Sequence, residues 1–294
     1  MTHTTAWIRR LALCLLAIGA MAPGLRGGLL AQAQTRPPAS PDVRVYVFDR
    51  GMTTMTPDAV RQAFGFDPQK MSSRLEVAYA CFLIVHPRGT LMWDTGATTD
   101  DPSGKPDTRP GAPKSLTSQL AEIGYAPRDI TYLALSHYHS DHTGDVNLFA
   151  GSTWLTPKAE RDYMFAEKPK GYINPAHYSL LRNSKTIIVD KDEYDVFGDG
   201  TVILKAAAGH TPGHQVLLVT LKKTGPLMLS GDLYHFNEER TLGWVPLPLE
   251  FNAEQSKASR AAVEAYVKKT KAQLWIEHDL ALRRTQKLSP AYYD

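Results

Sequence analysis

The sequence predicts an α/β fold, an αββα sandwich in which two mixed β-sheets pack face to face and helices flank them. Strand-like runs occur in both halves of the chain, helical runs follow the first hairpin and separate the last strands, and no linker divides residues 42–294. Apolar faces of sheets and helices must be buried against one another, and layered packing achieves this for such an order of elements. We therefore expect one domain that begins near Asp42.

In the first half of the chain, the elements follow from apolar runs bounded by turn and capping residues. The turn Pro-Arg-Gly at 87–89 joins the strands of a hairpin. Ser115 is placed to cap a helix that Gly124 ends, and the Pro-, Gly- and Asp-rich stretch 100–113 is expected to be a surface loop. The expected elements are strands at 43–48, 78–85, 90–93 and 130–135, and a helix from Ser115 to about Ile123.

The second half repeats short apolar runs of strand length and adds one long helical stretch. The expected strands lie at 152–155, 186–189, 201–205, 215–221, 227–230 and 273–276, and the expected helices at 158–165 and 254–270.

Composition agrees with a globular domain. Of the 294 residues, 43% are hydrophobic and 21% are charged, which is ordinary for a chain that buries a large core. The formal net charge is +3, and the basic side chains are scattered among nearly as many carboxylates. No concentrated basic surface is expected, so nucleic acid is not predicted as a partner.

Residues 1–33 are predicted to be a secretory signal peptide. An arginine pair at 9–10 precedes the apolar run 11–22, and the small-residue sequence Ala-Gln-Ala, ending at Ala33, follows. A membrane anchor is the alternative, but this run is shorter than the roughly 20 residues that a span needs. After cleavage no stable membrane span remains, and the protein is expected to be periplasmic or secreted, by the general or the twin-arginine route. Residues 34–41 are expected to form a flexible lead-in.

The two cysteines exclude an internal disulfide in the exported protein. Cys14 lies inside the leader, so only Cys81 remains. Cys81 falls within the expected strand 78–85 and is predicted to be a buried thiol that packs as a small apolar group.

Four residues that can bind metal ions occur within six positions. The segment 136–145 reads S-H-Y-H-S-D-H-T-G-D and contains His137, His139, Asp141 and His142. Where a strand passes into a loop, alternate residues project to the same side, so the first two histidines can hold one ion while the turn directs the others toward a second. A single histidine is more often a packing or surface residue, but that explanation does not account for the cluster.

Three later residues complete a plausible ligand set. They are His210 in Gly-His-Thr-Pro-Gly, Asp232 in Ser-Gly-Asp and His278 in Glu-His-Asp, and each follows a strand-like or extended run. Taken singly, each has another explanation: His210 could be an ordinary loop residue, Asp232 could cap a helix, and His278 could lie on the surface. Their joint position at strand ends favours metal binding.

These motifs, in this order, resemble those of the metallo-β-lactamase superfamily along nearly the whole chain after the leader. The resemblance implies the metallo-β-lactamase fold, with one metal held by His137, His139 and His210, a second by Asp141, His142 and His278, and Asp232 bridging the two. The Asp-Thr-Gly at 94–96 resembles the first motif of the superfamily, in which the aspartate supports the ligand loop and does not bind metal.

The resemblance also implies the chemistry. Two divalent ions roughly 3.5 to 4 Å apart share a hydroxide whose parent water has a pKa near 7, and this hydroxide attacks the substrate carbonyl. Asp141 is placed to protonate the leaving oxygen. Zinc is the first expectation for a histidine-rich site, with cobalt, manganese and iron as alternatives. The chain contains no G-x-S-x-G nucleophile motif.

Within the superfamily, the pattern of residues 75–96 resembles the N-acyl homoserine lactonases, which open the ring ester of acylated signals used in quorum sensing. True β-lactamases carry Cys or Ser where this chain has Asp232. Glyoxalase II enzymes append a helical region after the last ligand, whereas only 16 residues (279–294) follow His278. The expected activity is hydrolysis of such a lactone, which makes the protein a quorum-quenching enzyme.

Other interpretations stay open. The domain could be another esterase or a phosphotriesterase-type hydrolase of the same fold, or a metal-binding protein without turnover, although a purely structural zinc site usually has four ligands, often cysteines. The partner is expected to be a small lactone or ester, and a homodimer is compatible with the sequence.

Two regions bear on the substrate. Some family members place a tyrosine that aids the carbonyl three residues after the bridging aspartate; here that position is His235, and the tyrosine is Tyr234. Either side chain could donate a hydrogen bond to the oxyanion, or both could simply pack. Residues proposed to line an acyl-chain pocket or its rim, with core packing or a subunit contact as the alternative, are Met52, Met55, Phe64, Phe66, Met71, 244–251, Tyr172, His177 and Tyr178.

Overall fold

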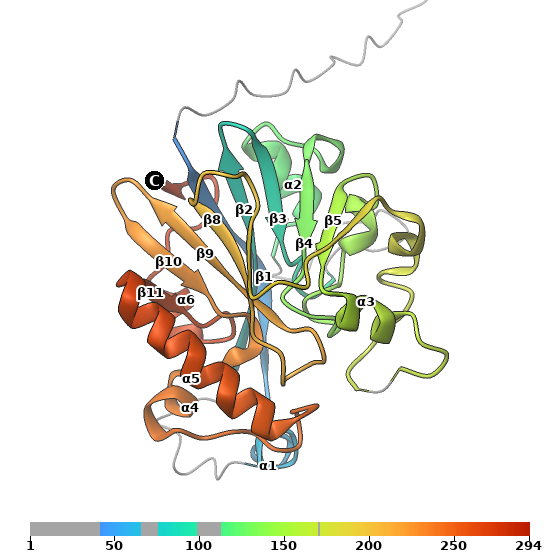
Figure 1. Cartoon of the computed structure of the whole chain (residues 1–294), viewed down its shortest axis with the longest axis vertical. Coiled ribbons are helices and arrows are strands. Elements are labelled where there is room, and N and C mark those ends of the chain that lie inside the picture. Colours follow the sequence, from blue (N-terminus) through green and yellow to red (C-terminus); the bar gives the residue numbers. More distant parts are fainter. Residues whose placement is uncertain (1–41, 66–75, 99–112, 170) are drawn as a thin grey trace, which may run out of the picture. The chain divides into compact units, whose positions relative to one another are not determined.

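The computed structural model describes residues 42–65, 76–98, 113–169 and 171–294, and within them two β-sheets pack face to face (Figure 1). The seven-stranded sheet has the order β12-β1-β2-β3-β4-β5-β6, and the five-stranded sheet has the order β11-β10-β9-β8-β7. The strands of the larger sheet are β1 (Arg44–Thr54), β2 (Glu76–His86), β3 (Gly89–Trp93), β4 (Tyr132–Ala134), β5 (Thr153–Thr156), β6 (Thr186–Ile188) and β12 (Tyr292–Tyr293). Those of the smaller sheet are β7 (Glu193–Asp195), β8 (Val202–Ala206), β9 (Gln215–Leu221), β10 (Gly225–Leu229) and β11 (Gln273–Trp275).

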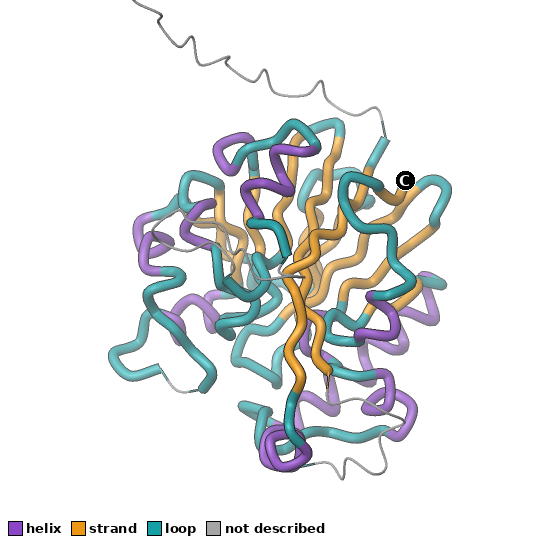
Figure 2. The backbone as a smooth tube through the Cα atoms, turned by 180° about the vertical axis from the view of Figure 1, so that it is seen from behind, coloured by secondary structure: helices purple, strands orange, loops and turns teal. Residues whose placement is uncertain are grey.

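Helices cover the outer faces of both sheets. The α-helices are α1 (Pro57–Phe64), α2 (Leu116–Glu122), α3 (Lys158–Met164), α4 (Asn237–Leu242), α5 (Ala253–Thr270) and α6 (Leu280–Arg283). Short 3-10 turns are η2 (Pro127–Asp129), η3 (Val146–Phe149), η4 (Ser179–Asn183) and η5 (Gly231–Leu233). Seen from behind, the helical segments lie outside the strands (Figure 2). Among the helices that the structure describes, none is long and apolar enough to span a bilayer.

The alternation of side chains along β2 shows how the layers are held. Ala80, Phe82 and Ile84 face the other sheet and belong to the core between the sheets, which also contains Leu217 and Leu229 of the smaller sheet. The intervening residues belong to a second core under α2, and a third core joins the smaller sheet to α5. Because successive residues of a strand point to opposite faces, one apolar run can supply two layers. The predicted αββα sandwich is confirmed.

Cys81 is one of the residues that face α2 from β2. It lies fully buried in that core with Phe48 and Leu83. Burial raises the pKa of its thiol far above the ordinary value. The prediction of a buried thiol that packs as a small apolar group is confirmed.

The sheets place several loops at one edge. β3 runs parallel to β4, and β10 runs parallel to β11. β8 and β10 flank β9 and are each antiparallel to it, so they run in the same direction. The carboxyl ends of strands that run in one direction meet at one edge of their sheet. The loops that follow β4, β8, β10 and β11 carry the candidate metal ligands.

The expected elements are found, with differences at their ends. β9 has the bounds that its apolar run predicts, whereas β4 covers only 132–134 of the expected 130–135. At one end Ile130 caps the 3-10 turn η2, and at the other the backbone N–H of Ser136 donates to the side chain of Asp94. The short elements α1, α4, α6, β7 and β12 were not anticipated. The predicted leader (1–33), the lead-in (34–41), nearly all of the predicted loop 100–113, and Phe66 and Met71 lie outside the described residues.

Candidate metal centre

The loop after β4 brings its histidines together by turning sharply. The backbone N–H groups of His142 and Thr143 both donate to the carbonyl of His139, at 3.0 and 3.1 Å. Upstream, the Ser136 carbonyl accepts a hydrogen bond from the backbone N–H of Gln215 on β9, at 3.0 Å. The loop is thereby tied to the smaller sheet, and His137, His139 and His142 lie buried at the junction of the two sheets.

One group of ligand atoms consists of His137, His139, His210 and Asp232. Nδ1 of His139 lies 2.9 Å from Nε2 of His137 and 3.1 Å from Nε2 of His210. All four residues are buried, and one ligand atom from each lies within 4.8 Å of the others. Burial, and after it the neighbouring imidazoles, keep the pKa of His137 and His139 well below the ordinary value, so these rings are neutral and able to ligate.

A second group consists of Asp141, His142 and His278. Nε2 of His142 lies 3.2 Å from Nε2 of His278, which lies 3.5 Å from Oδ2 of Asp141. The Asp141 side chain is the most open of the three, at 16% exposure. This group matches the second ligand set that the family resemblance implies.

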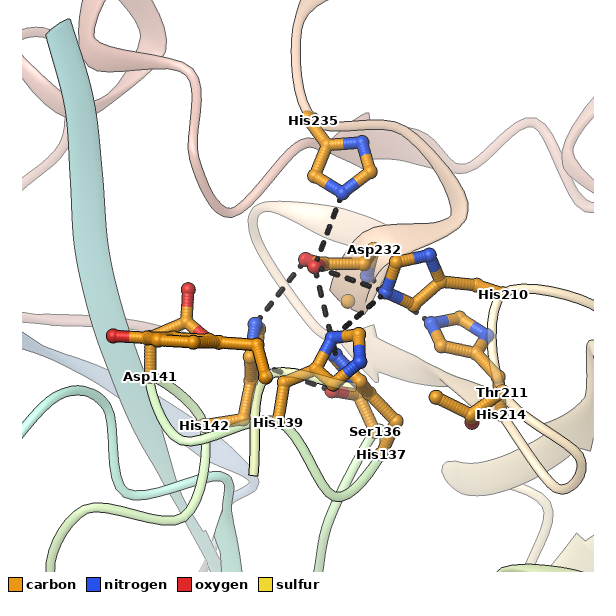
Figure 3. Close-up of polar contacts among 12 residues, drawn as sticks. Ser136, His137, His139, Asp141, His142, His210, Thr211, His214, Asp232 and His235 are labelled. Carbon is orange, nitrogen blue, oxygen red and sulfur yellow. Dashed lines mark hydrogen bonds and ion pairs between the residues drawn. The ribbon is translucent and has the colours of Figure 1, made fainter. Parts of the chain in front are cut away.

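Asp232 stands between the two groups (Figure 3). Its Oδ2 lies 3.5 Å from Nε2 of His137 and 3.4 Å from Nε2 of His210. Its Oδ1 lies 3.2 Å from Nε2 of His142 and 3.0 Å from Nε2 of His278. Burial by itself raises the pKa of Asp232, but the imidazoles of His278 and His142 bring it well below the ordinary value. The carboxylate is therefore ionised, with one oxygen toward each group, as a bridging ligand requires.

The donor set fits two divalent cations. Nε2 of His137 lies 2.9 Å from Nδ1 of His139, and burial keeps the pKa of both rings well below the ordinary value, so both rings can offer a lone pair to an ion at this point. Oδ1 of Asp232 is buried, and among the described residues its contacts with the imidazoles of His142 and His278 are ion pairs without hydrogen-bond geometry. Mixed imidazole and carboxylate donors of this kind are those that zinc and related ions take in catalytic sites.

Asp94 supports this centre from the end of β3. Its Oδ1 accepts the backbone N–H of Ser136 at 2.7 Å, and its Oδ2 lies 3.2 Å from Nδ1 of His142. Glu277 also faces that nitrogen, at 3.5 Å. Asp94, His142 and Glu277 form a third close group, but both carboxylates face the ring nitrogen that is turned away from Asp232. They orient a ligand, so the predicted supporting role of Asp94 is confirmed.

Other supporting residues were not singled out from the sequence. Nδ1 of His214 donates to the carbonyl of Ala207 at 3.1 Å, and its Nε2 accepts the backbone N–H of Asp232 at 3.1 Å. Burial lowers the pKa of His214 to about 3, consistent with this neutral role. Glu160 of α3 accepts hydrogen bonds at 2.8 Å from Oγ1 of Thr211 and from the backbone of Gly213, and so holds the loop that carries His210.

The structure distinguishes the two candidate oxyanion donors. Nε2 of His235 lies 3.2 Å from Oδ2 of Asp232, and Figure 3 shows the ring pointing into the centre. The hydroxyl of Tyr234 instead donates to Glu264 of α5 at 3.2 Å, and its ring belongs to the core between α5 and the smaller sheet. Tyr234 is therefore not brought into the site, because consecutive residues after η5 point in opposite directions.

Of the predicted rim and pocket residues, some lie near the centre and others pack in the core. Tyr172 is 64% exposed, with its ring 6.5 Å from that of His139, and Phe64 packs edge-on against His235 at 5.1 Å. Tyr178 lies in the core under α2 and donates its hydroxyl to the carbonyl of Met164 at 3.1 Å, so of the two alternatives, rim and core, the structure shows core packing. Met52, Trp244 and Phe251 expose 46%, 37% and 55% of their surface.

An αββα fold whose strand ends carry two groups of histidines and carboxylates joined by one aspartate is the architecture of a dinuclear metal centre. A profile of the metallo-beta-lactamase superfamily matches residues 75–271, and the chain belongs to this superfamily.

Two relatives with similar sequences are both N-acyl homoserine lactonases. The chain is 29% identical over 273 residues to the N-acyl homoserine lactonase AttM of Azorhizobium caulinodans, covering 86% of this chain and 99% of that protein. It is 28% identical over 229 residues to an N-acyl homoserine lactonase of Bacillus sp., covering 74% of this chain and 88% of that protein.

Solved structures show the same fold. The crystal structure of a quorum-quenching N-acyl homoserine lactone lactonase superimposes with a TM-score of 0.67 at 21% identity, covering 85% of this chain and 97% of that chain. AidC, a dizinc quorum-quenching lactonase solved with its product, gives a TM-score of 0.62 at 17% identity, covering 86% and 94%.

Proposed function

We propose that this protein is a dinuclear metal-dependent hydrolase that opens the lactone ring of N-acyl homoserine lactones. The observation that carries the proposal is the position of Asp232, whose two oxygens face separate ligand groups. The match covers 99% of the AttM lactonase and 88% of the Bacillus sp. lactonase, which supports this substrate class over others in the superfamily.

The metals are proposed to be zinc. When bound, two divalent ions supply Lewis acidity for the ester carbonyl and a water-derived nucleophile at neutral pH. Around them, the side chains of the protein exclude bulk water: of the seven proposed ligands, only Asp141 keeps appreciable solvent contact. Asp141 is therefore the residue placed to pass a proton to the ring oxygen as it leaves.

His235 is proposed to contact the substrate carbonyl. It is not one of the proposed ligands, yet its Nε2 lies beside the bridging carboxylate and its ring stacks parallel to that of His278 at 6.0 Å. A donor at this place stabilises negative charge that develops on the carbonyl oxygen, and such donors typically contribute about 100-fold or more in rate.

The activity is tested on zinc-loaded protein with a series of N-acyl homoserine lactones and with a phosphotriester and a β-lactam for comparison. Opening of the lactone yields one carboxylic acid, so a pH-stat follows turnover directly, and recovery of the lactone on acidification distinguishes ring opening from loss of the acyl chain. His137→Ala is the inactive control. Lactone turnover no faster than this control would overturn the proposal, and faster turnover of the phosphotriester would reassign the substrate.

We also propose that residues 1–33 direct export and are removed. The support is the sequence itself, in which an arginine pair, an apolar run and Ala-Gln-Ala follow in order. Cell fractionation followed by N-terminal sequencing of the mature protein tests this. The expected new terminus is Gln34; an intact Met1 terminus in the cytoplasmic fraction would contradict it.

A further inference from the structure

A chain of buried charged groups links His235 to His210 behind the centre. Nδ1 of His235 donates to Oε1 of Glu239 at 3.0 Å, and Oε2 of Glu239 lies 3.0 Å from Nη2 of Arg260. The same guanidinium nitrogen lies 3.6 Å from Glu250, whose other oxygen lies 3.8 Å from Nδ1 of His210. Each of these side chains is at most 7% exposed.

Arg260 is the centre of this arrangement and is itself held by two further contacts. Its Nη1 donates to the carbonyl of Trp244, and its guanidinium stacks over the ring of Tyr234 at 4.6 Å. Arg260 belongs to α5, whose apolar face packs on the smaller sheet. The guanidinium is thus fixed by the packing of α5, and it stacks on the ring of Tyr234.

Glu239 in turn has little freedom. It is 3% exposed, and its Oε2 also accepts the backbone N–H of His235 at 3.3 Å. A carboxylate that contacts both the ring nitrogen and the backbone of one histidine restrains the rotation of that ring. The ring also packs edge-on against Phe64 at 5.1 Å and against His210 at 5.2 Å, contacts that set no direction for its nitrogens. Those two nitrogens face Glu239 on one side and Asp232 on the other.

We propose that Glu239 and Arg260 are positioning residues for the reaction: α5 fixes Glu239 through Arg260, and Glu239 fixes the His235 ring with Nε2 beside Asp232. This inference rests on the proposed function for its kinetic consequence. Its structural content, the orientation of one imidazole, can be measured without turnover.

A neighbouring ion pair provides a matched control. Glu264 of α5 contacts Arg240 of α4 at 2.7 Å and accepts the Tyr234 hydroxyl. It joins the same two helices as the Glu239–Arg260 pair, but it does not contact His235. E264Q therefore weakens the α4–α5 contact and the Tyr234 hydrogen bond while leaving both contacts of Glu239 with His235 in place.

The test compares E239Q, E264Q and the wild type, each loaded with zinc. Gln keeps the shape of Glu, but its amide cannot accept from both His235 and Arg260, so the ring loses its fixed orientation. We expect kcat of E239Q to fall about 10- to 100-fold, with KM changed less than about twofold and unchanged zinc content. E264Q should keep activity within about threefold. R260K, which cannot span both carboxylates, is the second variant if E239Q does not fold.

Two further readouts separate positioning from general damage. In an H235A background, E239Q should cause no additional loss, because a positioning residue acts only through its target. Long-range ¹H–¹⁵N NMR of the His235 ring should show the protected Nδ1–H in the wild type and in E264Q, and its loss in E239Q. Equal losses in E239Q and E264Q, full additivity with H235A, or an unchanged ring signal would each overturn the proposal. Absence of lactone turnover in the wild type would overturn the proposed function, and the NMR comparison would still decide the positioning.

Discussion

Asp94→Asn is expected to weaken one metal site selectively while leaving the fold nearly intact. Asp94 is fully buried and has a positive φ of 55°, a conformation that Asn also adopts readily. Asn retains Oδ1 and so keeps the 2.7 Å hydrogen bond from the backbone of Ser136. Its amide NH₂, however, replaces Oδ2 and presents hydrogens to Nδ1 of His142, which now lies 3.2 Å from a carboxylate oxygen.

The magnitude follows from that one contact. A hydrogen bond to a charged group contributes about 1.5–3 kcal/mol, and each 1.4 kcal/mol is about tenfold in affinity. Replacing the carboxylate oxygen by an amide NH₂ also favours the His142 tautomer that carries its hydrogen on Nε2. This is the nitrogen that faces Asp232 and His278 and would bind the metal. Glu277 at 3.5 Å offers a second acceptor, which limits the effect. We expect a metal affinity about 10- to 100-fold weaker at the Asp141, His142 and His278 group.

Competition of the metal-loaded protein with a chelator measures both affinities, and urea unfolding of the metal-free protein measures the fold. The zinc ion at the weakened Asp141, His142 and His278 group should be removed at a much lower chelator concentration than in the wild type. The other zinc ion should be released only at high chelator concentration, as in the wild type. The unfolding free energy should change by about 1 kcal/mol or less. If both equivalents weaken together, or neither does, Asp94 does not act through His142. Asp94→Ala, which also leaves the Ser136 N–H unpaired, should destabilise the metal-free protein by about 1–3 kcal/mol more than Asn does.

Three further predictions concern neighbouring residues. Tyr234→Phe should retain lactone turnover within about threefold, since the hydroxyl contacts Glu264 and not the centre; a loss like that of His235→Ala would return Tyr234 to the site. Burial raises the pKa of Glu160 from 4.5 to about 7, so the unfolded chain releases this proton first, and stability falls as pH rises from 4.5 to about 7, by up to roughly 3 kcal/mol. Glu160→Gln should flatten that slope in urea unfolding, and an unchanged slope would refute this. Gly231→Ala should lower the unfolding free energy by more than about 2 kcal/mol, because φ is +48° and a Cβ would lie 2.5 Å from that of Ser136; wild-type stability would contradict this.

The elements that could be predicted from the sequence are those whose apolar pattern has no competing interpretation. The run that forms β9 is apolar and bounded by turn residues on both sides, and its ends agree with the structure. Ser115 caps α2 through the backbone of Ser118, as its position before the helix predicts. The ligand cluster was evident because four metal-binding side chains within six positions have little other explanation.

The features that the sequence does not predict depend on the direction in which side chains point and on contacts between residues far apart in the chain. Nothing in the order of residues 232–235 shows that Tyr234 turns toward α5 while His235 turns toward Asp232. Arg260 lies 25 positions after His235, and only the packing of α5 on the smaller sheet brings it behind the site. The helix α4 has just six residues, of which only Glu239 is buried, so it carries no apolar periodicity to reveal it. The sequence left Tyr178 open between the rim and the core, because an aromatic residue near a site is compatible with both; the structure places it in the core.

Asp232 is proposed to join two metal sites that together open the lactone. Titrating metal-free protein with zinc while following ring opening of an N-acyl homoserine lactone tests it most directly. Activity should rise until the second equivalent is bound and then level off, and Asp232→Ala should stay inactive throughout. Full activity at one equivalent, or turnover that does not depend on zinc or on Asp232, would contradict the account.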